Sequence, residues 1–203
     1  MFIRIERPEF LASLSKAIGK SAGDWTWYSI VPVWGIIFLF ISIAASSNVP
    51  ADFWSADHRI GAMLAYVGIF VLNGLVASAA WSTSVKMYEV LSAPGFGAYA
   101  ASEGLMDGYV VVIRLAHCVQ LFSVFASALG IFVLALDASD LFYDRAVLAV
   151  MIFSTAYAFK MVSHIVCIMQ DILWQKGIFD DAADKQGNKI GQAARGTLHS
   201  LGI

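Results

Sequence analysis

The stretch Ala146–Trp174, AVLAVMIFSTAYAFKMVSHIVCIMQDILW, is a long apolar run near the C-terminal end of this chain. It is 29 residues long, and its only charged side chains are Lys160 and Asp171. At about 1.5 Å per residue, a helix of this length exceeds the roughly 30 Å hydrocarbon core of a bilayer. The stretch therefore predicts a transmembrane helix, and it raises the question of why such an apolar segment carries a lysine.

Three further apolar runs precede it, at Trp25–Ala45, Ile60–Trp81 and Tyr109–Leu136. The chain is 59% hydrophobic and 14% charged, with a mean hydropathy of +0.72, which is too apolar for a soluble domain. None of the runs alternates with the period of a barrel strand, so the spans should be helices. We expect an all-α integral membrane protein whose domain, residues 25–174, is a bundle of four transmembrane helices.

The basic residues predict the orientation of these helices. Nine of the eleven that lie outside the spans fall on one side, namely Arg4, Arg7, Lys16, Lys20, Lys86, Lys176, Lys185, Lys189 and Arg195. Only Arg59 and Arg145 fall on the other side, among several aspartates. Because basic loops stay in the cytoplasm, we expect a multi-pass protein of the inner membrane with both termini cytoplasmic.

The segments on the cytoplasmic side carry weaker signals. Within residues 1–24, Phe10, Leu14 and Ile18 recur at helical spacing, which indicates an amphipathic helix on the membrane surface, or else a frayed leader with chance periodicity. Residues 175–203 should form a cytoplasmic tail with a weak surface helix.

The loop between the second and third spans, SAPGFGAYAASEGLMDG, is rich in glycine. Phe96 and Tyr99 stand among glycines that allow unusual backbone geometry. The loop is either an ordinary connector or a surface that docks a partner, and these two aromatic residues are its candidate contacts.

Polar residues inside the spans are the main candidates for function. They are Asn73, Arg114, His117, Lys160, His164 and Asp171. On one interpretation Lys160 extends its stem towards the headgroups while Arg114 pairs with Asp171. On the other, Asn73 meets Lys160 in a hydrated cavity that binds an anion or a lipid phosphate, because ionisable groups inside a membrane usually serve a function.

Cofactor chemistry has less support in the sequence. His117 and His164 lie at matching depths, so they are alternative axial ligands for a b-type haem, although adjacent helices pack too closely for bis-histidine ligation. Zinc or copper at His117, His164 and Cys167 lacks a fourth ligand, so we expect no metal site. No nucleophile–base pair or phosphate loop appears, and we expect no enzyme.

The formal net charge of −2 provides no basic excess, so a role in binding nucleic acid is not expected. Small residues at Gly61/Ala65, Gly74/Ser78 and Ala126/Gly130 allow close helix approach, which favours a homo-oligomer. The expected function is a pore or scaffold of an envelope machine, of the secretion, conjugation or phage-defence type, that docks a cytoplasmic or membrane protein partner. The alternative is a haem- or quinone-binding anchor subunit of a redox complex.

Overall fold

The computed structural model describes residues 33–136 and 141–200, and within these ranges it leaves out the side chains of Leu105, Asp107 and residues 186–200. The described chain is helical and contains no strand. Its elements are α2 (Val33–Ser47), the short 3-10 helix η1 (Ala51–Trp54), α3 (Arg59–Leu91), α4 (Phe96–Ser102), α5 (Leu105–Ala135) and α6 (Leu141–Ser200). The predicted amphipathic segment 1–24, and residues 25–32 of the first predicted span, lie outside the described residues.

Three of the described helices are long and apolar enough to cross a membrane. They comprise Arg59–Leu91, Gly108–Ala135 and the Leu141–Lys185 part of α6. These lengths and compositions are those of a multi-pass membrane protein. The apolar helix α2 is shorter, with 15 described residues, so the four-span arrangement stays a prediction.

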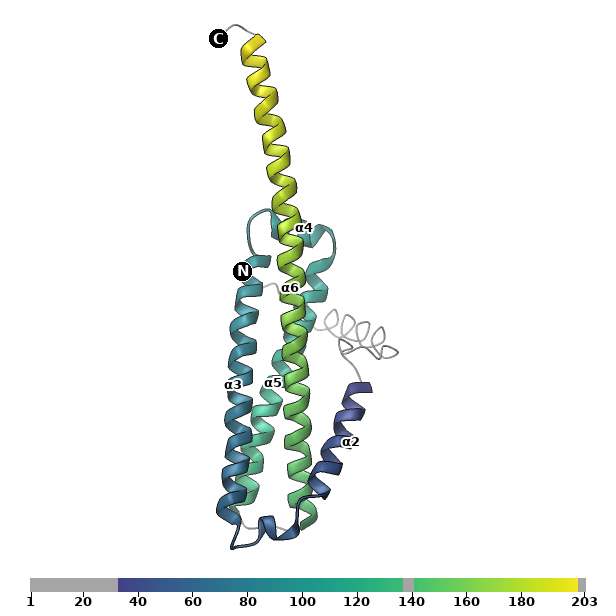
Figure 1. The fold of residues 1–203 in the computed structure, drawn as a ribbon, viewed down its shortest axis with the longest axis vertical. Coiled ribbons are helices and arrows are strands. Elements are labelled where there is room, and N and C mark those ends of the chain that lie inside the picture. The colour runs from purple at the N-terminus through teal and green to yellow at the C-terminus, as the bar shows by residue number, and fades with distance from the viewer. Residues whose placement is uncertain (1–32, 137–140, 201–203) are drawn as a thin grey trace.

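The helices α3, α5 and α6 pack side by side, and α2 packs along α6 (Figure 1). Large apolar side chains cover the outward faces of this bundle, among them Leu75, Phe125 and Leu129, whose exposed fractions are 65%, 71% and 62%. Exposed apolar area of this kind is unfavourable in water and is expected where helices meet lipid.

One end of the bundle, here called the hairpin end, is where α3 starts and where α5 gives way to α6 (Figure 1). Arg59 and Arg145, the two basic residues predicted to lie on the side opposite the cytoplasm, bond to backbone carbonyls at this end. Arg59 Nη2 donates to the oxygens of Leu134 and Ala135, at 3.0 and 3.2 Å, and Arg145 Nη2 donates to Val49 O at 3.1 Å. Since the last carbonyls of a helix have no partner within it, Arg59 stabilises the end of α5.

The opposite end, here called the cap end, extends beyond the predicted spans. Helix α3 continues to Leu91 and α6 to Ser200, whereas the hydropathy of the sequence predicts spans that end at Trp81 and Trp174. The extra turns of α3 bury Met87 and Leu91 in one apolar cluster with Phe96, Ala100 and Ile172. Packing against α4 and α6 therefore keeps α3 helical after its sequence turns polar.

Helix α4 is held by its glycines and by aromatic contacts. Gly95 and Gly104 flank it with φ angles of +84° and +67°, which glycine adopts without strain. Phe96 and Tyr99 both pack on Phe179 of α6, with ring centroids 5.9 and 5.4 Å away. The predicted docking loop is thus a short helix anchored to α6.

Candidate functional site

The first polar centre of the bundle is formed around Asn73 of α3, which is completely buried. Its Nδ2 lies 2.6 Å from Ser127 Oγ and 3.3 Å from Ser123 O of α5, and 3.0 Å from Thr155 Oγ1 of α6. Both hydroxyls donate to their own helix backbone, to Ser123 O and Met151 O, so each can accept from Asn73. This centre links three helices in the buried interior of the bundle.

Asn73 does not meet Lys160, so that expected pairing is wrong. Its amide is directed at Ser127 and Thr155, and its Oδ1 atom has no hydrogen-bond partner in the described part of the chain. Matching depth along two helices had suggested the pair, but depth does not specify which way each side chain points around its helix.

The second polar centre lies about one helical turn nearer the cap end and consists of Tyr157, Lys160 and His164 of α6. Lys160 has 0% exposure, and its Nζ is 3.4 Å from His164 Nε2. The same Nζ lies 5.8 Å from the centre of the Tyr157 ring. This burial favours the interpretation that Lys160 faces the protein interior over the interpretation that it reaches out to headgroups.

Two further α5 residues, Gln120 and the candidate His117, lie at the same level or nearer the cap end. Gln120 Nε2 donates to Ala158 O at 2.9 Å, which links α5 to α6. His117 packs against Trp81 of α3, with ring centroids 4.7 Å apart and the rings tilted by 33°, and its buried Nε2 has no hydrogen-bond partner among the described residues. The two histidines therefore have different neighbours, Trp81 for His117 and Lys160 for His164.

Asp171 is exposed and lies beyond these centres, towards the cap end. Its carboxylate accepts a hydrogen bond from the hydroxyl of Tyr109, which ties the start of α5 to α6. The expected pair between Arg114 and Asp171 does not form, so that expectation is wrong. Asn73, His117, the Lys160–His164 pair and Asp171 thus have separate contacts along the bundle and do not form one cluster.

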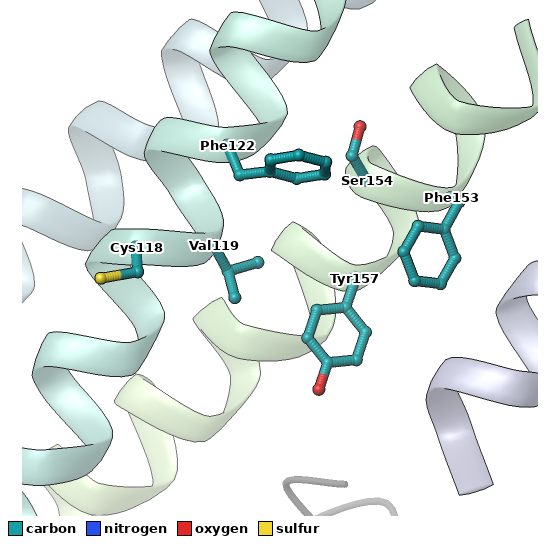
Figure 2. Close-up of a pocket in the computed structure, with 6 residues that line it drawn as sticks. All are labelled: Cys118, Val119, Phe122, Phe153, Ser154 and Tyr157. Atoms are coloured by element: carbon teal, nitrogen blue, oxygen red, sulfur yellow. The ribbon is translucent and has the colours of Figure 1, made fainter. Parts of the chain in front are cut away.

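An apolar groove of about 280 Å³ lies between α5 and α6, beside the second polar centre. Its lining residues are Cys118, Val119, Phe122, Phe153, Ser154 and Tyr157 (Figure 2). Tyr157 belongs to both features, and its hydroxyl points away from Phe122 and Ser154. Helix α2 approaches the same tyrosine, since Phe38 packs edge-on against its ring at 6.5 Å.

Among residues 33–136 and 141–185, no group of three histidine, cysteine or acidic side chains is placed to hold a metal ion. Haem ligation by His117 and His164 stays a prediction, which an absorption spectrum of the purified protein would test.

Several residues of these centres were missed from the sequence, among them Tyr109, Gln120, Ser127 and Phe179. One signal was present, because Gln120, Ser123 and Ser127 recur at helical spacing on one face of α5. Comparison with protein-family models, curated proteins and solved structures finds no match, so the functional argument depends on this chain's own residues.

Proposed function

We propose that this chain is a non-enzymatic structural subunit of the inner membrane, with four spans and both termini in the cytoplasm. It self-associates in the bilayer into a scaffold or pore and presents its cap end to a protein partner. A subunit of this kind fits an envelope machine of the secretion, conjugation or phage-defence type.

The observation that carries this proposal is the length of α6. Its 60 residues form one helix about 90 Å long, while a bilayer with its headgroups is about 40–45 Å thick. Beyond the contact of Phe179 with α4, the helix projects well past the rest of the described chain (Figure 1). A helix that projects this far is accessible to a protein partner, and the membrane does not account for its length.

The projecting part of α6 also carries the charge that favours a cytoplasmic location. Lys185, Lys189 and Arg195 lie in it, and Lys176, just before it, forms an ion pair with Asp180. By the positive-inside rule, such a segment stays on the side where the protein is made. The same rule places α4 and the rest of the cap end in the cytoplasm.

Support for self-association comes from the outward face of α3. Gly61, Gly68 and Gly74 have no neighbouring atom within 4 Å of the position where a Cβ would lie. Gly130 of α5 differs, because a Cβ there would lie 2.3 Å from Met151 Sδ inside the bundle. The α3 glycines are therefore available for close approach by a second copy, whereas Gly130 serves packing within the chain.

Replacing Gly68 with leucine should disrupt the oligomer, because a large side chain would separate two closely packed α3 helices. Counting subunits in liposomes by single-molecule photobleaching would measure the change. Gly108→Leu on α5 is the matched control, since its Cβ position is equally open, and it should keep the wild-type subunit number. A monomeric wild type, or a Gly68→Leu protein with unchanged subunit number, would contradict self-association through α3.

A further inference from the structure

Two side-chain amides in the interior of the bundle each have an oxygen atom that lacks a hydrogen-bond donor. Asn73 of α3 has 0% exposure and Gln120 of α5 has 2%, so both amides are shielded from the surface of the bundle. Within the described part of the chain, neither Asn73 Oδ1 nor Gln120 Oε1 accepts a hydrogen bond. A buried acceptor in this condition is costly, because it has lost its bonds to water without gaining others.

Rotating the two amides does not supply the missing donors. Asn73 Nδ2 lies 3.3 Å from the carbonyl oxygen of Ser123, and Gln120 Nε2 lies 2.9 Å from that of Ala158. Exchanging nitrogen and oxygen in either amide would place two acceptors against each other, because a carbonyl oxygen cannot donate. The orientation of both amides is therefore fixed, and their oxygen atoms are the ones that need a donor.

The neighbouring hydroxyl groups do not supply the donors either. Ser127 Oγ donates to Ser123 O, and Thr155 Oγ1 donates to Met151 O, at 2.7 Å in each case. Ser123 Oγ donates to Gln120 O at 2.8 Å. Because a hydroxyl has one proton, each of these three groups is committed to its own helix. Acceptors therefore outnumber donors around Asn73 and Gln120, and the missing partner must be a ligand that donates.

Water fits this requirement better than a cation does. A water molecule supplies two donors and no charge, and ordered water satisfies buried polar groups both in globular proteins and within membrane helices. A monovalent cation would bring a charge into a region of low dielectric, and the hydrogen-bond partners of the two amides are all neutral. No carboxylate among these partners would compensate for the charge.

The spacing of the two amides suits a single water molecule. Their contacts on α6 are Thr155 for Asn73 and Ala158 for Gln120, which are three residues apart, or about 4.5 Å along a helix. One water that donates two hydrogen bonds of about 2.8 Å at a tetrahedral angle joins oxygen atoms about 4.5 Å apart. One molecule is therefore the right size to serve both acceptors.

We propose that an internal water molecule binds between α3 and α5 and donates one hydrogen bond to Asn73 Oδ1 and one to Gln120 Oε1. It extends the first polar centre towards the cap end and links α3 to α5 where the two amides make no direct contact with each other. This site does not depend on self-association, on a docked partner or on the orientation of the chain in the membrane.

A crystal structure of the wild type grown from lipid, at a resolution better than about 2 Å, tests the site. The expected result is a density peak about 2.7–3.0 Å from both amide oxygens. In Gln120→Met, which preserves length but removes the amide, this peak should be lost, whereas Gln170→Met, at an exposed position of α6, should keep it. Absent density in the wild type, a protein donor on either oxygen, or a peak that survives Gln120→Met would overturn the proposal.

A cation at the same place is tested by thermal unfolding in detergent. The midpoint should be the same in sodium chloride and in N-methylglucamine chloride of equal ionic strength, because a ligand that binds only the folded state raises the midpoint with its concentration. A midpoint that rises with sodium in the wild type would assign the site to a cation and overturn the proposal. Both wild-type measurements decide the question if Gln120→Met does not fold.

Discussion

Gly97→Ala is expected to destabilise the cap end by about 2–3 kcal/mol, the upper part of the range for overpacking a tight site. A Cβ at this position would lie 2.4 Å from Leu91 O, which is a backbone atom and cannot move aside as a side chain can. The first turn of α4 would have to shift, and with it the ring of Phe96, which is buried against Phe179. The expected result is that α4 detaches from α6 while the membrane helices stay folded.

Hydrogen–deuterium exchange of residues 92–104, together with thermal unfolding in detergent, would measure this effect. Gly177→Ala is the matched control, because that glycine is helical and has open space at its Cβ position. The control should be neutral or stabilising by up to about 1 kcal/mol, the difference in helix propensity. Wild-type protection of residues 92–104 in Gly97→Ala would show that the close approach to Leu91 is not needed.

Asn73→Leu is expected to lower the free energy of unfolding by about 2 kcal/mol. Hydrogen bonds between membrane helices contribute about 0.6 kcal/mol each on average, and the Asn73 amide contacts three acceptors on two helices. Leucine has the same number of side-chain heavy atoms and the same branch point as asparagine, so the substitution removes the polar contacts without leaving a cavity. Ser127 and Thr155 keep their bonds to their own backbones, which limits the loss.

Thermal or chemical unfolding in detergent micelles would measure the change. Asn48→Leu is the control, because Asn48 is exposed just after α2, near the hairpin end, and its side chain donates to Ala44 O of that helix. It should change stability by no more than about 0.5 kcal/mol. An Asn73→Leu protein as stable as the wild type would mean that the buried amide does not hold α3, α5 and α6 together.

The helical membrane class could be predicted from the sequence because hydropathy and length are local properties. The ends of the helices could not, because tertiary contacts determine them. After Trp81 the α3 sequence becomes polar, yet Ser84 and Met87 are buried and the helix continues to Leu91. Hydropathy and helix propensity depend on the local sequence, so they do not predict that this part of α3 packs against α4 and Phe179.

The candidate site shows the same limit. Sequence reasoning placed Asn73 and Lys160 at similar depth, but the rotation of each helix about its axis decides which side chains meet. Asn73 therefore bonds to Ser127 and Thr155, and Asp171 bonds to Tyr109 in place of Arg114. Lys160 and His164 could be paired in advance, because a spacing of four on one helix fixes their proximity.

The two aromatic residues of the glycine-rich loop illustrate a third case. The sequence predicts Phe96 and Tyr99 as candidate partner contacts, whereas the structure packs both against Phe179. Their packing makes the cap end a firm base for the projecting part of α6. Contacts within this chain would therefore fix the base of the α6 segment to which a partner binds.

Cysteine labelling tests whether the cap end and the projecting part of α6 lie in the cytoplasm, as proposed. In a protein with Cys118 and Cys167 replaced by alanine, single cysteines would be placed at exposed positions, Asp57 at the hairpin end, Glu103 after α4 and Asp181 on α6. A membrane-impermeant maleimide should label Asp57→Cys in cells with a permeable outer envelope, and Glu103→Cys and Asp181→Cys only after the inner membrane is opened. Labelling of Glu103→Cys and Asp181→Cys before the inner membrane is opened would contradict the proposed cytoplasmic location of these segments.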